Sequence, residues 1–259
     1  MIESIIAFLQ KLKIINKSKI DNIFTTKPIQ NPKSTVILMP VASHIEPSVD
    51  DALRKLENMG YTVWRKYGFS AIDQGRCVIA QEALDAGFEH LFWIDSDVCF
   101  WPYDVEKIIN MGLPFVSAPY TVKGWPALTT EFYETDIKLG EHGKLYEIKH
   151  AATGFMYTHR SVYEKIVNHY KMKKVKIWGG QYKVYPYFYP LIINEEYLGE
   201  DFAFCHRLSE SGTKLYCDTR ISLAHIGKYS YSLGFIENNG HLDEPKNTIY
   251  TQIPNKSYS

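Results

Sequence analysis

Two carboxylates stand at the end of an apolar run, in the order Asp95-Ser96-Asp97. The preceding Leu91–Ile94 has the character of a buried strand, and residues 98–101 are again largely apolar or aromatic. Acids two positions apart can face one crevice and suit a hard divalent cation that also holds phosphate oxygens. The same residues also suit a turn or a helix N-cap. Because burying paired acids among apolar residues is costly without a cation or donors, we favour a metal site.

A second acidic pair, Glu200-Asp201, follows Gly199 at the start of a predicted helix. Acids are common in a first helical turn because they interact favourably with the helix dipole. His225 follows a predicted short apolar strand, with Gly227 two positions later. A single histidine is more often structural than a ligand, yet imidazole also serves as an additional metal ligand, and glycine permits close backbone approach. Taken singly, both motifs leave a structural and a functional interpretation open.

Asp73 and Arg76 lie in the segment 70–78, beyond a predicted strand and at the start of a predicted helix. An arginine there can pair with a phosphate group or hold Asp95 or Asp97 in place. The alternative is an N-cap acid and an exposed arginine on the surface. The sequence supports the two interpretations equally.

The elements that must position these residues alternate between strand and helix in the first half of the chain. Strands are predicted at 34–40, 61–67, 89–94 and 114–118, and helices at 47–59, 74–86 and 102–111. Beyond them we expect irregular or hairpin-like structure over 121–150, helices at 161–169 and 200–211, and short strands at 214–217 and 221–224. This alternation predicts an α/β fold with a mostly parallel central sheet flanked by helices. Ligands of such sheets bind beyond the carboxyl ends of the strands, where Asp95 and Asp97 are expected.

The composition limits the class of protein. Lys and Arg together number 29, as do Asp and Glu, so the net charge is zero and we expect no nucleic-acid partner. The four cysteines form no C-x-x-C pair, which predicts neither a zinc site nor a redox motif. We interpret them as reduced thiols in a cytosol-like compartment.

The first 20 residues have an amphipathic helical pattern that is too short to span a bilayer. We favour a helix packed on the domain or on a second subunit, which leaves a homo-oligomer open. The alternative is a basic interfacial helix at a membrane surface. No small-residue cleavage site follows the helix, so a cytoplasmic location is expected.

The ordered set of motifs resembles the GT-A glycosyltransferases. The set consists of the D-x-D after a strand, Thr153-Gly154-Phe155, the G-E-D at a helix start and the H-x-G around His225. It is most similar to the compact enzymes of large DNA viruses, of chlorovirus type, and of phages. The resemblance covers roughly residues 34–230, and the whole set is more specific than any one motif.

The resemblance implies a role for each matching residue. Asp95 and Asp97 would be metal ligands for Mn²⁺ or Mg²⁺, with Asp97 the more direct one, and His225 would be the distal ligand. Asp201, or less favourably Glu200, would be the general base of an inverting enzyme. The donor site would be formed by Pro40, Val41, Ala42, His44, Ser70 and Asp73 at the base and ribose, by Arg76, Asp95 and Ser96 near the diphosphate, and by Thr153 and Gly154 at the sugar. Cys77 departs from the pattern, which has an asparagine after this arginine.

The implied fold is a GT-A-type, Rossmann-like nucleotide-binding domain with a smaller acceptor-side region. A single domain over 1–259 would comprise an N-terminal helical extension (1–33), a nucleotide-sugar-binding half (34–120), an acceptor and catalytic half (121–230) and a C-terminal tail (231–259).

The implied activity is metal-dependent transfer of a sugar from a nucleotide-sugar donor, with UDP favoured, to a glycan or glycoprotein acceptor. For a viral protein the setting would be the host-cell cytoplasm. The tyrosine-rich stretch 182–197, with Trp178 before it, would either stack on acceptor sugars or simply pack.

Two other functions compete with this one. A sugar-nucleotide nucleotidyltransferase usually has a glycine-rich phosphate loop and a basic residue after its first strand, whereas this chain has Pro-Val-Ala-Ser-His at 40–44. A non-catalytic sugar- or nucleotide-binding module needs neither the acid pair nor a base. It would be favoured if Asp95, Asp97 and His225 lay apart and Glu200 and Asp201 both faced solvent.

Overall fold

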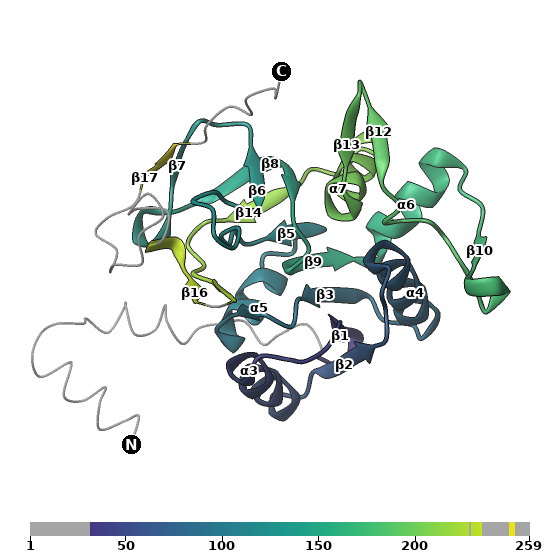
Figure 1. The fold of residues 1–259 in the computed structure, drawn as a ribbon, viewed down its shortest axis with the longest axis horizontal. Coiled ribbons are helices and arrows are strands. Elements are labelled where there is room, and N and C mark those ends of the chain that lie inside the picture. Colours follow the sequence, from purple (N-terminus) through teal and green to yellow (C-terminus); the bar gives the residue numbers. More distant parts are fainter. Residues whose placement is uncertain (1–31, 228, 235–248, 252–259) are drawn as a thin grey trace, which may run out of the picture. The chain divides into compact units, whose positions relative to one another are not determined.

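The central element of the fold is an eight-stranded sheet with the strand order β2-β1-β3-β9-β5-β14-β8-β6 (Figure 1). The computed structural model describes residues 32–227, 229–234 and 249–251. The strands are β1 (Thr35–Val41), β2 (Thr62–Tyr67), β3 (His90–Ile94), β5 (Phe115–Ser117), β6 (Thr130–Phe132), β8 (Leu145–Ala151), β9 (Phe155–His159) and β14 (Tyr216–Asp218). From the pairings, β9 and β8 run opposite to the other six strands. The sheet is therefore mostly parallel in direction.

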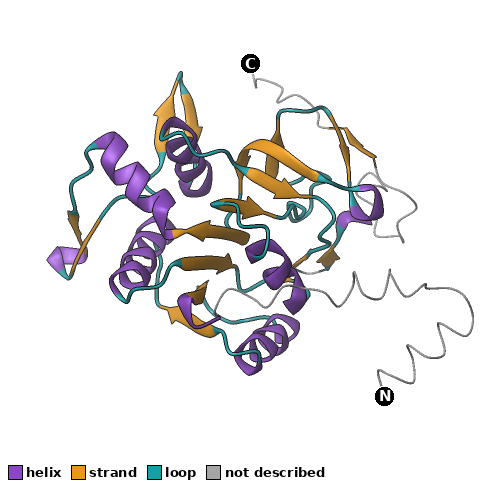
Figure 2. Cartoon of the chain, turned by 180° about the vertical axis from the view of Figure 1, so that it is seen from behind, coloured by secondary structure: helices purple, strands orange, loops and turns teal. Residues whose placement is uncertain are grey.

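Helices cover both faces of this sheet (Figure 2). They are α3 (Pro47–Asn58), α4 (Ile72–Asp85), α5 (Pro102–Ile109), α6 (Arg160–Tyr170) and α7 (Glu200–Glu210). Alternate side chains of β1 divide between two cores, since Val36 and Leu38 pack with α4, α6 and α7, and Ile37 and Met39 pack with α3 and α5. Successive strand side chains point to opposite faces, so a strand covered on both sides must be apolar throughout. The predicted α/β class with a mostly parallel sheet flanked by helices is confirmed.

Several short elements surround the sheet. A three-stranded sheet joins β4 (Val98–Cys99), β15 (Ala224–Ile226) and β16 (Ser230–Tyr231). Strand pairs form from β10 (Val175–Ile177) with β11 (Tyr182–Val184), β12 (Leu191–Ile193) with β13 (Glu196–Leu198), and β7 (Asp136–Lys138) with β17 (Ile249–Thr251). Short 3₁₀ turns occupy Pro32–Ser34, Gly140–His142 and Trp178–Gly180.

The structure differs from the sequence predictions in the second half of the chain. Strand β9 was not predicted, although it lies in the middle of the sheet between β3 and β5. The strand predicted at 221–224 was wrong in position, since β15 begins at Ala224 and contains His225. Its register is set by pairing with β4, where His225 lies opposite Val98, and this partner is far away in the sequence. Local pattern carries no information on such a pairing.

Two of the sequence predictions concern the ends of the chain. The amphipathic helix predicted for residues 1–20 and most of the tail from residue 231 lie outside the described residues. Among the helices that are described, none is both long and apolar enough to cross a membrane. All four cysteines carry free thiols.

Candidate active site

Asp97 and His225 meet where the small sheet joins the end of β3. Strand β15 pairs antiparallel with β4, and the amide of Ile226 donates to the carbonyl oxygen of Asp97 at 2.7 Å. This backbone contact brings His225 Nε2 to 3.5 Å from Asp97 Oδ1. The other carboxylate oxygen, Oδ2, accepts a hydrogen bond from Lys123 Nζ at 2.5 Å. Two residues that are 128 positions apart in the sequence are thus side by side.

The charge state of this pair follows from its partners. His225 Nδ1 lies 2.9 Å from the carbonyl oxygen of Thr121, which only accepts hydrogen bonds, so Nδ1 carries a proton. Nε2 then carries either a proton, which it donates to Asp97, or a lone pair that faces this carboxylate. Burial opposes ionisation of Asp97, but hydrogen bonds from His225 and Lys123 outweigh it and lower its pKa to about 2. Asp97 is therefore a carboxylate at neutral pH.

This arrangement fits a divalent cation. A carboxylate oxygen and an imidazole lone pair that face each other repel unless a proton or a metal ion lies between them. Mn²⁺ accepts both donor types, and an outer hydrogen bond such as that from Nδ1 to Thr121 typically orients a ligating histidine. Within the described residues no group of three His, Cys, Asp or Glu side chains forms a metal cluster. Two protein ligands with substrate phosphates completing the shell is a known pattern for such ions.

Asp95 has a different partner, Arg76. The backbone amide of Asp95 donates to the carbonyl of Gly154 at 3.1 Å, and its Oδ1 accepts a hydrogen bond from Arg76 Nη2 at 2.9 Å. Arg76 Nε also lies 3.6 Å from Glu200 Oε1. A single guanidinium, whose side chain is only 4% exposed, thus links the D-x-D motif to the start of α7.

Arg76 is held in an environment that favours its charge. Burial alone would lower the pKa of Arg76, but the carboxylates of Asp95 and Glu200 outweigh that effect and raise it. The guanidinium also lies over the ring of Trp93, 5.7 Å from its centroid. Its Nη1 is buried without a hydrogen-bond partner among the described residues, so it keeps a free donor in the site. The alternative of an exposed surface arginine is wrong.

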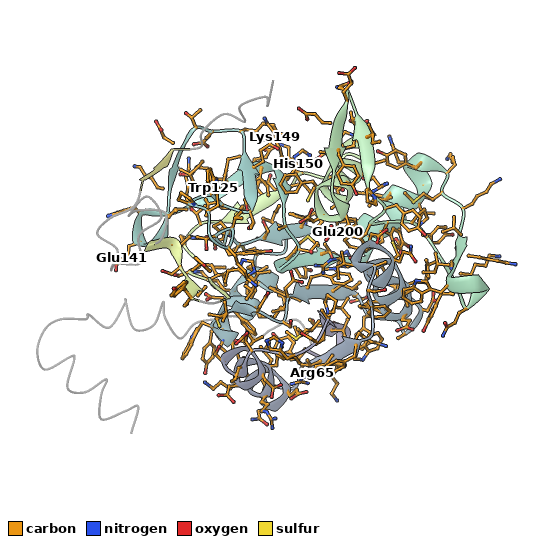
Figure 3. The ribbon with its side chains drawn as sticks, in the orientation of Figure 1. Arg65, Trp125, Glu141, Lys149, His150 and Glu200 are labelled. Carbon is orange, nitrogen blue, oxygen red and sulfur yellow. The ribbon has the colours of Figure 1, made fainter. Side chains whose placement is uncertain are left out.

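Asp201 lies in the first turn of α7, directly after Glu200, which is labelled in Figure 3. Burial and the adjacent charge of Glu200 raise the pKa of Asp201 to about 6, although its Oδ1 accepts a hydrogen bond from the amide of Phe202 at 2.8 Å. The ring of Phe202 stacks on His150 of β8, with centroids 4.8 Å apart, and this contact fixes the start of the helix. A carboxylate with a pKa near 6 is mostly ionised at pH 7 and is still basic enough to accept a proton.

Gly154 lies between Asp95 and Tyr120 and contacts both of them. A Cβ atom at this position would lie 2.3 Å from the hydroxyl oxygen of Tyr120, so only glycine fits. The amide of Gly154 donates to that hydroxyl at 3.1 Å, and the Tyr120 ring meets the His225 ring edge-on at 5.1 Å. Thr153, the other predicted sugar-pocket residue, is almost completely buried.

The predicted nucleotide-contacting residues divide by exposure. Pro40 and Val41 belong to β1 and are buried in the sheet, whereas Ala42 and His44 are exposed on the loop that follows. This loop lies against the D-x-D turn, because the amide of Glu46 donates to the carbonyl of Ser96 at 2.9 Å. The two remaining residues flank the start of α4, where Ser70 is exposed and Asp73 is partly buried.

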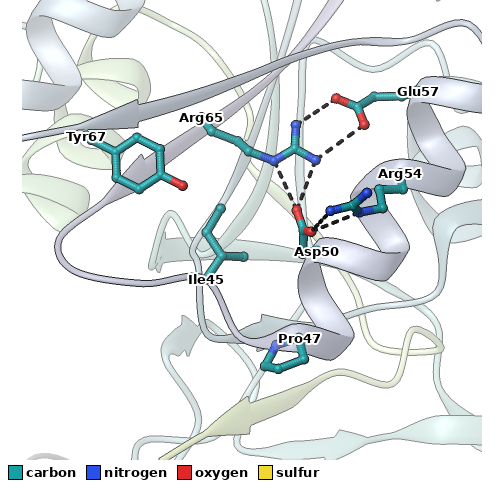
Figure 4. Close-up of a pocket in the computed structure, with 7 residues that line it drawn as sticks. All are labelled: Ile45, Pro47, Asp50, Arg54, Glu57, Arg65 and Tyr67. Atoms are coloured by element: carbon teal, nitrogen blue, oxygen red, sulfur yellow. Dashed lines mark hydrogen bonds and ion pairs between the residues drawn. The ribbon is translucent and has the colours of Figure 1, made fainter.

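A pocket of about 710 Å³ opens beside this loop (Figure 4). Its apolar lining comes from Ile45, Pro47 and Tyr67, the last of which is 59% exposed at the carboxyl end of β2. The rest of its lining is a balanced ion-pair network of Asp50, Arg54, Glu57 and Arg65. None of the residues predicted for the metal or the base lines this pocket.

The tyrosine-rich stretch mostly packs. Tyr187 is buried, and Tyr182, Tyr185 and Tyr189 lie against the core on the α4 side of the sheet. Tyr197 is the exception, with 70% of its surface exposed on β13.

Sequence reasoning missed two residues of the site, Lys123 and Tyr120. Both lie in or beside the segment 121–150, which was predicted only as irregular or hairpin-like. A lysine between two short apolar stretches gives no signal of its own. Its place beside Asp97 depends on the approach of β15, which pairs with β4 on one side and carries His225 toward Thr121 on the other.

Comparisons with known proteins bear on the fold. No protein-family model matches the chain, and no curated protein sequence matches it. Among solved structures, the crystal structure of A197 from STIV has a TM-score of 0.50 at 15% identity, covering 87% of this chain and 97% of that one. At this identity the likeness concerns the fold alone.

Glycosyltransferases are also among the similar structures. One is involved in the glycosylation of the major capsid of PBCV-1, with a TM-score of 0.30, 13% identity and coverage of 50% of this chain and 62% of that one. Another is GalNAc-T7 with UDP, GalNAc and Mn²⁺, with a TM-score of 0.42, 12% identity and coverage of 79% and 45%. Both TM-scores lie below 0.5.

Proposed function

We propose that this chain is a metal-dependent glycosyltransferase of GT-A type that moves a sugar from a nucleotide-sugar, with UDP favoured, to a hydroxyl of a glycan or glycoprotein. The observation that carries the proposal is the contact of Arg76 with both Asp95 and Glu200. It joins the acids at the end of β3 to the acids at the start of α7, beside the pair formed by Asp97 and His225. In a metal-dependent sugar transfer to a hydroxyl, the metal offsets the charge of the leaving group and a nearby proton acceptor takes the proton of the hydroxyl.

Asp97 and His225 would hold the cation, Mn²⁺ or Mg²⁺. The bound ion would supply positive charge to offset the charge on the leaving diphosphate. Asp95 is engaged by Arg76, so its part in the proposal is to orient the guanidinium toward the donor. The proposed partner of the buried Nη1 donor of Arg76, which has no hydrogen-bond partner among the described residues, is an oxygen of the diphosphate or sugar.

Asp201 is the proposed general base for an inverting transfer. Glu200 is held by Arg76, which draws its carboxylate away from proton transfer, whereas burial raises the basicity of Asp201. An acceptor hydroxyl is a poor nucleophile until a carboxylate takes its proton. This division of roles favours Asp201 over Glu200.

The nucleoside is proposed to lie in the pocket beside Tyr67. Pro40 and Val41 are buried in β1 and do not line this pocket. Ile45 and Pro47 offer apolar surface, and the exposed ring of Tyr67 offers a face for stacking. In the proposal the nucleotide-sugar-binding half is 34–120 and the acceptor half 121–230.

The competing functions lack comparable support. A non-catalytic module would be favoured if Asp95, Asp97 and His225 lay apart and if Glu200 and Asp201 both faced solvent. Asp97 instead lies beside His225, and Glu200 is ion-paired with Arg76. The turn after β1 has neither the glycines nor the basic residue of a nucleotidyltransferase.

A thermal-shift panel of UDP, GDP and CDP with and without Mn²⁺ tests the donor site. We expect one nucleotide to stabilise the protein only with the metal, by about 2.7 kcal/mol at a hundred times its Kd. Asp97→Asn should abolish this stabilisation, and the control Asp51→Asn, on an exposed position of α3, should retain it. No shift by any nucleotide under either condition would contradict the proposal.

A further inference from the structure

The proposed metal site already holds a cation of the protein itself. Lys123 Nζ lies 2.5 Å from Asp97 Oδ2, on the carboxylate whose other oxygen faces His225. The Lys123 side chain is 37% exposed and that of Asp97 33%, so the pair lies at the mouth of the site. The ammonium thus neutralises the carboxylate that a divalent cation would need.

The local fold directs Lys123 to this position. The turn Val122–Ala127 closes on itself, with the amide of Val122 donating to the carbonyl of Ala127 at 2.9 Å, and Gly124 adopts a left-handed φ of 72°. The turn is anchored at its base by the bridge between Thr121 and Leu128. Figure 3 labels Trp125 on the same turn.

The aliphatic part of the Lys123 side chain packs against Gly227. A Cβ atom added at Gly227 would lie only 3.3 Å from Lys123 Cδ, so the absence of a side chain there leaves room for the lysine. Gly227 belongs to the H-x-G motif that contains His225. The glycine of this motif therefore accommodates the lysine that neutralises Asp97.

A divalent cation held by Asp97 Oδ1 and His225 would repel the ammonium at Oδ2, because like charges a few ångströms apart repel at the effective dielectric of a protein surface. Metal binding should therefore weaken the contact of Lys123 with Oδ2. The anchored turn keeps it at the rim of the site. The nucleotide-sugar donor carries a negatively charged diphosphate, and the ammonium of Lys123 is a suitable partner for it.

We propose that Lys123 is the resident counter-ion of Asp97 in the metal-free protein and a diphosphate-binding residue in the donor complex. This inference rests on the proposed function. Lys123 would pair first with the carboxylate of Asp97 and then with the diphosphate. Removing its charge should therefore raise the affinity for Mn²⁺ and lower the affinity for UDP.

The test compares unmodified protein with Lys123→Met, Lys123→Arg and the control Lys214→Met. Lys214 is a matched control because its Nζ pairs with Glu147 at 2.9 Å, far along the sequence from the site. Mn²⁺ affinity is measured without nucleotide from the electron paramagnetic resonance signal of free Mn²⁺. UDP affinity is then measured by calorimetry at saturating Mn²⁺.

Lys123→Met should bind Mn²⁺ about fivefold tighter, since an exposed ion pair contributes up to about 1 kcal/mol. It should bind UDP at least about tenfold more weakly, because a charge-assisted hydrogen bond is lost. Lys123→Arg, which keeps the charge, and Lys214→Met should stay within about twofold of the unmodified protein in Mn²⁺ affinity.

Other results overturn the inference. A loss of both affinities in Lys123→Met would indicate a merely structural lysine. Unchanged Mn²⁺ affinity in Lys123→Met would contradict the counter-ion role, and unchanged UDP affinity in this variant would contradict the diphosphate-binding role. In either case, metal-dependent UDP binding by the unmodified protein would still support the proposed function. If the unmodified protein binds no UDP with Mn²⁺, the proposed function fails and this inference fails with it.

Discussion

Replacing Asp201 by Asn should stabilise the protein at neutral pH. The native pKa of about 6 exceeds the ordinary value of 3.8 because burial and the neighbouring Glu200 disfavour the charged form. The folded protein therefore binds this proton more tightly than the unfolded chain does. Stability is unaffected below both pKa values, falls as the pH rises from about 4 to 6, and stays lowered above that.

The magnitude follows from the size of the shift. About two pKa units at 1.36 kcal/mol each give a penalty of about 3 kcal/mol at pH 7.5, and the same linkage gives about 1.5 kcal/mol at pH 5. Asn keeps an oxygen that accepts the hydrogen bond from Phe202, so the substitution removes the charge with little change of shape. Since the side chain is partly exposed, these figures are upper values.

Urea denaturation at pH 5.0 and 7.5 measures the effect. We expect Asp201→Asn to unfold with a higher free energy than the unmodified protein, and the gain should be larger by up to about 1.5 kcal/mol at pH 7.5 than at pH 5.0. The control Asp51→Asn should show no such pH-dependent gain. An equal gain at both pH values, or none, would refute the conclusion that burial and Glu200 raise the pKa of Asp201.

Further predictions concern the geometry around this residue. Gly154→Ala should cost about 1–3 kcal/mol in urea denaturation, because its Cβ would clash with the Tyr120 hydroxyl, and a neutral effect would contradict the tight contact. Arg76→Met should lower the free energy of unfolding by about 3 kcal/mol in urea denaturation, since it removes the buried guanidinium that pairs with Asp95 and Glu200, and a loss below about 0.5 kcal/mol would argue against these ion pairs. Tyr67→Ala should weaken Mn²⁺-dependent UDP binding about fivefold to tenfold in calorimetry with no change in melting temperature of the free protein, and unchanged affinity would place the nucleoside elsewhere.

The sequence alone determined the first half of the fold. Apolar runs such as 34–40 and 89–94, separated by helical segments, predict a parallel sheet covered on both faces, and β1 and β3 are buried along their whole length. These are local signals, since burial on both faces requires an unbroken apolar run. The placement of the D-x-D at a strand end follows from the same signals.

The tertiary structure alone decided how the site is assembled. The pairing of β4 with β15 brings His225 to Asp97, and the position of α4 carries Arg76 between Asp95 and Glu200. Strand β9 was missed because its place between β3 and β5 depends on partners distant in sequence. The role of Lys123 could not be predicted, because a single lysine in an irregular segment is distinguished only by its contact with Asp97. The local sequence pattern indicates which segments are buried, but it does not specify which distant strand or charged side chain each of them meets.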